Sequence, residues 1–170
     1  TEGLVGSEMC IRDRSNTSGI PIKLMNEGRS DDFKKCFAIT HFFNPPRYLN
    51  LFEVVPGPNC DKSVLEFLLE YGEKFLGKTS VLAKDTPAFI GNRIGIFGIM
   101  SLFHQIKNGE FSIEEVDTLT GPAIGRPKSA TFRTADIAGL DTMCHVANGV
   151  FDKCPNDESR NVFKLSLIHI

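Results

Sequence analysis

The chain has 170 residues, of which 41% are hydrophobic and 24% charged, and its formal net charge is −2. This composition is typical of a globular protein, and the length suits one domain or the adjoining parts of two. A slightly acidic chain gives no reason to expect a nucleic-acid partner. No run reaches the roughly 18 to 20 uncharged residues that a membrane span needs.

Five cysteines are scattered along the chain: Cys10, Cys36, Cys60, Cys144 and Cys154. No two have C-x-x-C spacing, and none lies at a metal-ligand interval from a histidine. We therefore predict no metal site. We expect reduced thiols in a cytoplasmic protein, since an odd, scattered set is not a disulfide framework.

The two ends differ in character from the rest. Residues 1–14 show no clear apolar period, and they lack the basic start and apolar middle of a signal peptide. The segment SEMCIRDR resembles translated sequencing-adapter read-through, and so does the tail LSLIHI. We expect residues 1–14 and 165–170 to be non-native or disordered, and the natural protein to continue beyond both ends.

The segment 15–85 alternates between strand and helix patterns. In chain order we predict a loop at 15–22, a helix at 31–36, strands at 37–43 and 49–55, a helix at 62–76 and a strand at 78–85. The first two strands are joined by only a few residues, whereas a parallel crossover needs a dozen or more, so they should pair antiparallel. The pattern favours the second half of an α/β domain with an antiparallel edge.

The segment 86–164 has a helical pattern. Thr86 can cap a long helix that Pro87 begins and that runs to about Asn108. This helix is apolar on most sides, which is typical of a helix buried in a bundle or against another chain. Ser112 opens a capping box for the next helix, and residues 134–152 form a further helix-rich stretch interrupted by a glycine. We therefore predict α/β followed by all-α.

Two ionisable residues, His41 and Glu53, lie twelve positions apart in runs that are otherwise apolar or aromatic. Burying such groups is costly unless each has a partner. A histidine with one ring nitrogen held by a carboxylate can accept a proton at the other, as a general base does. The alternatives are a core histidine bonded to backbone and a glutamate on a solvated edge strand.

Two further polar residues could contact a ligand. Asn92 lies near the start of the long helix, on its polar strip, and Ser18 lies in the loop after the first strand. A solvated amide and a turn serine are the alternatives. Spacing alone would select neither residue.

Three motifs, in order and at matching spacing, carry a resemblance to a known family. SNTSG at residues 15–19, HFFNP at 41–45 with the downstream Glu53, and KDTPAFIGNR at 84–93 resemble the 3-hydroxyacyl-CoA dehydrogenases of fatty acid β-oxidation. The resemblance covers roughly residues 15–150. It implies the C-terminal part of a Rossmann-type sheet domain at 15–85 and a helical, dimerisation-type domain at 86–164.

The resemblance also implies a chemistry and its residues. Members of the family oxidise 3-hydroxyacyl-CoA to 3-ketoacyl-CoA, so it implies an acyl-CoA substrate, NAD as cofactor and a homodimer formed through the helical domain. His41 would be the general base and Glu53 its orienting partner. Ser18 and Asn92 would hold the substrate. Asn44, together with Ser18, would contact the cofactor.

The sequence departs from the family in ways that matter. The G-x-G-x-x-G turn that cradles the dinucleotide pyrophosphate is missing from the 170 residues, so we expect this segment alone to lack appreciable NAD affinity. Ala88 stands where the family usually has glycine, and residues 121–141 look more like larger multifunctional bacterial relatives. Two alternatives stay open: a related hydroxy-acid dehydrogenase with a non-CoA substrate, and a non-catalytic helical dimerisation module with a sheet remnant.

Overall fold

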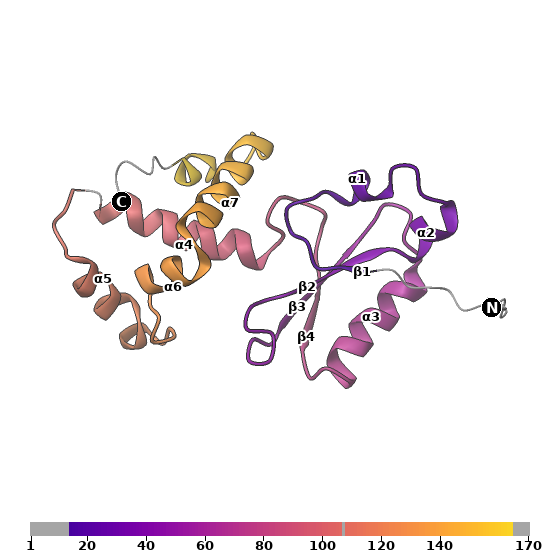
Figure 1. Cartoon of the computed structure of the whole chain (residues 1–170), viewed down its shortest axis with the longest axis horizontal. Helices are drawn as coiled ribbons and strands as arrows, with labels where there is room; N and C mark the ends of the chain where they lie inside the picture. Colours follow the sequence, from indigo (N-terminus) through magenta and orange to yellow (C-terminus); the bar gives the residue numbers. More distant parts are fainter. Residues whose placement is uncertain (1–13, 107, 165–170) are drawn as a thin grey trace, which may run out of the picture. The chain divides into compact units, whose positions relative to one another are not determined.

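The computed structural model describes residues 14–106 and 108–164, and the chain divides into two compact units, Thr1–Ile90 and Gly91–Ile170 (Figure 1). The ends expected to be non-native, 1–14 and 165–170, lie outside the described residues except for Arg14, which is part of a strand.

The first unit is built on a four-stranded sheet in the order β1-β2-β3-β4. Its strands are β1 (Arg14–Ser15), β2 (Ala38–Phe42), β3 (Leu51–Pro56) and β4 (Thr79–Leu82). β1 runs parallel to β2, β3 runs antiparallel to β2, and β4 runs parallel to β3. The predicted antiparallel pairing of the two central strands is confirmed.

Helices cover both faces of this sheet: α1 (Ile22–Asn26), α2 (Asp31–Cys36) and α3 (Lys62–Lys74). Ile39 and Val55 pack in a cluster with Ile22 of α1, whereas their strand neighbours Ala38 and Val54 pack in another cluster with α3. Successive residues of a strand point to opposite faces, so both faces are buried and the strands appear in the sequence as continuous apolar runs.

Local sequence signals explain where these helices lie. The Ser30 hydroxyl accepts the Phe33 N–H at 3.2 Å and caps α2, as predicted. Gly72 lets α3 approach the sheet closely, since a Cβ there would lie 2.6 Å from Cδ1 of Phe52. The short helix α1 was not predicted.

The second unit is helical: α4 (Gly91–Ile106), α5 (Ile113–Thr120), α6 (Phe132–Ala138) and α7 (Leu140–Lys153), with 3₁₀ turns at Pro122–Ile124 and Arg160–Phe163. The predicted capping box is present, because Ser112 and Glu115 bond each other's backbone N–H groups. Gly139, at φ +87°, separates α6 from α7 as expected. The buried core of this unit includes Ile96, Met100, Phe103, Val116, Ala135, Met143, Ala147, Val150 and Phe163.

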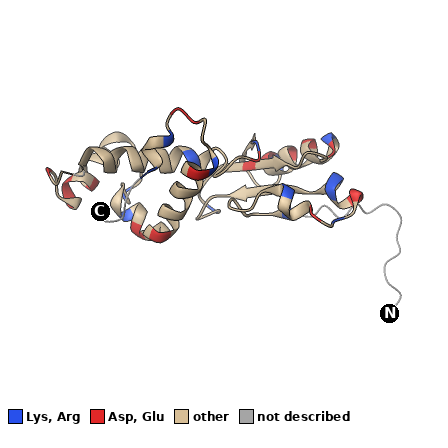
Figure 2. Cartoon of the chain, turned by 90° about the horizontal axis from the view of Figure 1, so that it is seen from above, with Lys and Arg blue, Asp and Glu red and all other residues tan. Residues whose placement is uncertain are grey.

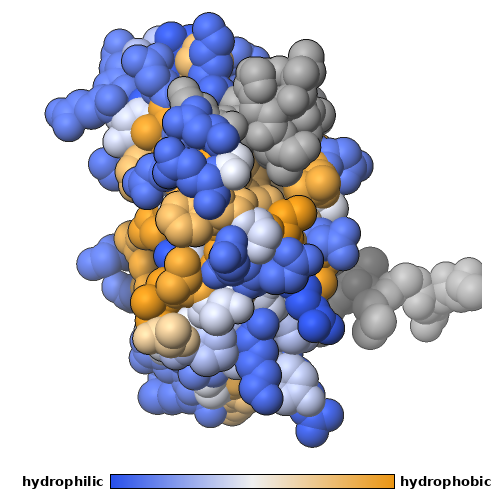
Figure 3. All heavy atoms as spheres, turned by 90° about the vertical axis from the view of Figure 1, so that its left-hand side faces the viewer, coloured by the Kyte–Doolittle hydropathy of each residue, from blue (hydrophilic) through white to orange (hydrophobic). Residues whose placement is uncertain are grey.

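The surface carries charged and apolar residues in both units. Acidic and basic segments are interspersed along the chain, so neither sign is confined to one unit (Figure 2). Apolar side chains also reach the surface of the helical unit (Figure 3). They include Ile94 and Ile137, which are 66% and 72% exposed. None of the described helices is long and apolar enough to cross a membrane.

The start of the long helix corrects one prediction. Thr86 and Pro87 do not begin α4, which starts at Gly91. Residues 86–89 instead form a turn in which the Phe89 N–H bonds the Thr86 carbonyl at 3.0 Å. Ala88 and Phe89 have positive φ values of 64° and 45°, so the backbone leaves the helical path before α4 begins.

Candidate active site

His41 and Glu53 are brought together by the register of the central hairpin. They lie directly opposite each other in the antiparallel β2–β3 pair, so their side chains share one face. Nδ1 of His41 lies 2.7 Å from Oε2 of Glu53. The residues are 6% and 0% exposed, respectively. The short connector predicted this pairing, and the structure adds the register that makes it a side-chain contact.

The second carboxylate oxygen of Glu53 is also bonded. Its Oε1 accepts the backbone N–H of Ile90 at 2.9 Å, one residue before α4 begins. A buried carboxylate is stable only when such bonds replace its lost hydration. An ionised carboxylate can only accept, so the proton of a neutral His41 lies on Nδ1 and Nε2 keeps its lone pair. The pair is therefore arranged to take up a proton at Nε2.

Two aromatic rings flank His41. The ring of Phe43 lies 4.7 Å from the imidazole, centroid to centroid, with an interplanar angle of 75°. The ring of Phe89 lies at 5.5 Å and 73°. Both are edge contacts of the kind that aromatic pairs prefer.

The other candidates are placed as follows. Ser18 lies half-buried in the loop after β1, and Asn44 lies exposed in the turn after β2. Asn92 is the second residue of α4 and belongs to the helical unit. The structure shows the predicted contact between His41 and Glu53, and the roles assigned to Ser18, Asn44 and Asn92 stay predictions.

Three groups that support this part of the structure were not predicted from the sequence. Asn16, within the SNTSG motif, accepts the Phe42 N–H through Oδ1 at 2.8 Å and so fixes the loop beside the end of β2. Asp85, within the KDTP motif, accepts the Ile22 N–H through Oδ2 at 2.9 Å. Neither has a partner that local spacing could reveal. The Ile90 N–H is a backbone donor, and no side-chain pattern marks it.

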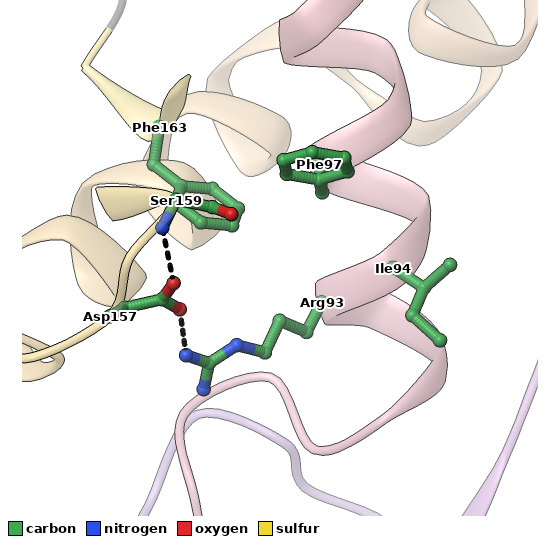
Figure 4. Close-up of a pocket in the computed structure, with 6 residues that line it drawn as sticks. All are labelled: Arg93, Ile94, Phe97, Asp157, Ser159 and Phe163. Carbon is green, nitrogen blue, oxygen red and sulfur yellow. Dashed lines mark hydrogen bonds and ion pairs between the residues drawn. The ribbon is translucent and has the colours of Figure 1, made fainter. Parts of the chain in front are cut away.

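An open pocket of about 240 Å³ lies in the helical unit (Figure 4). It is lined by Arg93, Ile94, Phe97, Asp157, Ser159 and Phe163. The Arg93 guanidinium bonds the Asp157 carboxylate. That hydrogen bond lowers the pKa of Asp157 and raises the pKa of Arg93. Asp157 also accepts the Ser159 N–H at 2.8 Å, so the pair connects α4 to the segment after α7.

The residues of this chain fit the nicotinamide end of a dinucleotide better than its pyrophosphate. Asn44 is exposed where β2 ends, and ligands of open α/β sheets bind at the carboxyl ends of strands. A side-chain amide there can hydrogen-bond a nicotinamide carboxamide. The sequence contains no G-x-G-x-x-G turn to hold a pyrophosphate.

The fold agrees with that of a solved enzyme. (S)-3-hydroxybutyryl-CoA dehydrogenase from Ralstonia eutropha superposes with a TM-score of 0.74 at 28% identity, over 86% of this chain and 50% of that one. A Rossmann-type sheet unit followed by a helical unit places the chain in the class of two-domain dehydrogenases, and the predicted fold class is confirmed.

Family comparison makes the assignment specific. Residues 10–86 match 3-hydroxyacyl-CoA dehydrogenase, NAD binding domain, and residues 89–166 match 3-hydroxyacyl-CoA dehydrogenase, C-terminal domain. The chain belongs to the 3-hydroxyacyl-CoA dehydrogenase family, which confirms the resemblance and the expected cofactor.

Two bacterial relatives are similar over most of the chain, and each is named a probable 3-hydroxyacyl-CoA dehydrogenase. The Bacillus subtilis protein is 54% identical over 151 residues, which cover 89% of this chain and 19% of the relative. The Deinococcus radiodurans protein is 50% identical over 144 residues, which cover 85% of this chain and 42% of the relative. The chain thus spans less than half the length of either relative.

Proposed function

We propose that the protein carrying this chain oxidises 3-hydroxyacyl-CoA to 3-ketoacyl-CoA with NAD, in fatty acid β-oxidation. The observation that carries the proposal is the buried His41–Glu53 pair at the end of β2. The family of the chain supplies the substrate class. A tautomer fixed by a carboxylate and a free ring nitrogen are the properties that a histidine needs to act as a general base.

In the proposed mechanism, Nε2 of His41 removes the proton of the 3-hydroxyl group. Glu53 stabilises the resulting imidazolium through the 2.7 Å bond to Nδ1. Bound NAD supplies the acceptor for the hydride that leaves carbon 3. The alcohol is thus oxidised to a ketone, because carbon 3 gives up a hydride to NAD and its oxygen gives up a proton to His41. The protein contributes alignment and the proton acceptor.

The remaining site residues are assigned by motif. Ser18 and Asn92 hold the substrate hydroxyl or thioester oxygen by hydrogen bonds, and Asn44, with Ser18, contacts the nicotinamide end of the cofactor. These roles suit neutral polar groups that can donate as well as accept. Their support is the motif match and, for Asn44, its exposure after β2.

The proposal includes a homodimer formed through the helical unit, in the cytoplasm. Its support is the set of apolar side chains exposed on that unit (Figure 3). A helix with apolar residues on most sides is commonly covered by another element or chain, and on α4 Ile94 is 66% exposed and Phe97 38%.

The test uses the full-length protein and follows NADH consumption with acetoacetyl-CoA as substrate. His41→Ala should lower turnover by about 10²- to 10⁴-fold, because the proton donor of the reverse reaction is lost. His145→Ala, which removes an exposed histidine of α7, is the matched control and should retain activity. Near-normal turnover of His41→Ala would refute the assignment of the base.

The same assay separates the alternatives. A hydroxy-acid dehydrogenase with a non-CoA substrate would reduce free acetoacetate in preference to the thioester. A non-catalytic module would reduce neither, and its gene would contain no G-x-G-x-x-G turn after a strand. The proposal requires strong preference for the CoA thioester.

A further inference from the structure

One hydrogen bond does not by itself fix the His41 ring. Glu53 holds only the Nδ1 atom of the ring. Rotation about χ2 of a histidine is broad, so the imidazole could still tilt around this hydrogen bond. A general base works only when its free nitrogen is held at the reacting proton. Another group must therefore restrain the plane of the imidazole.

Phe43 and Phe89 both meet the imidazole edge-on, but Phe43 is only partly buried, whereas Phe89 lies in the core and is the better fixed of the two. Its ring meets the imidazole edge-on at 5.5 Å and 73°, and Phe89 itself is 3% exposed. It packs in the cluster that contains Ile39 and Val55 of the two strands that carry His41 and Glu53. The ring is therefore immobilised against the sheet that supports the base.

The backbone around Phe89 is held in an uncommon conformation. Ala88 and Phe89 both have positive φ, which side-chain-bearing residues seldom adopt. Contacts on both sides maintain it, because Asp85 accepts the Ile22 N–H and Glu53 accepts the Ile90 N–H. Conformations of this kind persist where the surroundings over-determine them, and they concentrate at functional sites.

We infer that Phe89 is a positioning residue that holds the plane of the His41 imidazole, while Glu53 ties both the imidazole and the turn of residues 86–90 to one carboxylate. The inference rests on the proposed role of His41 as the base. Phe89 acts through His41 and takes no part in proton transfer. Its contribution therefore exists only when the imidazole is present.

A double-mutant cycle in the full-length enzyme tests this dependence. Phe89→Leu should lower kcat with acetoacetyl-CoA about 10-fold, with KM changed less than about 2-fold, because alignment is lost and substrate binding is kept. In a His41→Ala background the same change should lower the residual rate less than about 2-fold, because nothing is left to align. Phe89→Met, which refills the volume without a ring, should behave like Phe89→Leu.

Phe37→Leu is the matched control. Phe37 is 4% exposed and belongs to the same cluster, but it stacks on Phe33 at 4.9 Å. Phe37→Leu should reduce thermal stability, as Phe89→Leu should, because each removes a buried ring. It should leave kcat within about 2-fold of the wild-type value.

Each outcome decides the inference. Equal losses from Phe89→Leu with and without His41, or an unchanged kcat in Phe89→Leu and Phe89→Met, would overturn it while leaving the base assignment intact. An equal fall in kcat in Phe37→Leu would also overturn it, because the effect would then be general to the cluster. Normal turnover of His41→Ala alone would instead refute the proposed function and, with it, this inference.

Discussion

Two acid–base pairs, one in each unit, differ in how their partners meet. His41 and Glu53 are twelve residues apart and face each other across two paired strands, almost fully buried. Arg93 and Asp157 are 64 residues apart and link α4 to the segment after α7, with side chains 29% and 15% exposed. The first pair is local to a hairpin, whereas the second depends on the whole helical unit.

The difference in chemistry follows from the cations. A guanidinium stays protonated at any ordinary pH, so Arg93 can anchor a carboxylate but cannot exchange a proton with a substrate. An imidazole titrates near neutrality and has a second nitrogen for a substrate proton. We therefore assign the proposed catalytic role to the first pair and a packing role to the second.

The largest expected contrast between the two pairs is in kcat, when the carboxylate of Glu53 or of Asp157 is replaced by an amide. In Glu53→Gln the amide can still accept from Ile90 N–H through its oxygen, but its NH₂ donates to Nδ1 of His41, so the imidazole proton moves to Nε2. We expect kcat in the acetoacetyl-CoA assay to fall about 10²-fold. Asp157→Asn is the paired control and should leave kcat within about 2-fold. Comparable losses in both variants would erase the contrast.

A smaller effect is expected on stability. Asp157→Asn should lower the free energy of unfolding by about 0.5 kcal/mol, since partly exposed ion pairs contribute little. The bond from Arg93 holds the pKa of Asp157 below its ordinary value of 3.8. The stabilisation is therefore present above that ordinary value, and it is lost as pH falls through the lower folded-state pKa.

Urea unfolding of the wild type and of Asp157→Asn, measured from about pH 6 down to about pH 2, checks the sign. The difference between the two proteins should shrink as the pH falls below the ordinary pKa. A difference that grows toward acid would contradict the assigned direction.

The smallest effect concerns the turn that reaches Glu53. Ala88 has φ +64°, a conformation that costs a residue with a Cβ but not a glycine, and Ala88→Gly should raise the free energy of unfolding by about 0.5 kcal/mol. Ala83 is similarly buried but its φ is not positive, so Ala83→Gly should lower the free energy of unfolding by about 1 kcal/mol. Chemical denaturation compares them, and equal destabilisation would show that the turn is not strained.

Local signals predicted much of the sheet unit and the contact between His41 and Glu53. The few residues between the central strands required an antiparallel hairpin, and this made a His41–Glu53 contact a reasonable expectation. Caps at Ser30 and Ser112 predicted two helix starts, because each side chain bonds a backbone N–H three residues on.

Long-range contacts could not be predicted in the same way. Pro87 is well suited to the first position of a helix, yet α4 begins at Gly91, because positive φ at Ala88 and Phe89 is maintained by tertiary packing. The contact of Arg93 with Asp157 likewise has no sequence signal, since it depends on how α7 ends. The glycine that the family usually has at position 88 would suit the positive φ found there.

The central claim is that Glu53 fixes the proton of neutral His41 on Nδ1 and leaves Nε2 to act as the base. Long-range ¹H–¹⁵N NMR of the ¹⁵N-histidine-labelled full-length protein, at a pH where His41 is neutral, measures the tautomer directly. The signal that Glu53→Gln perturbs should show a protonated Nδ1 and a bare Nε2. A neutral His41 protonated on Nε2 would have no lone pair there and would contradict the account.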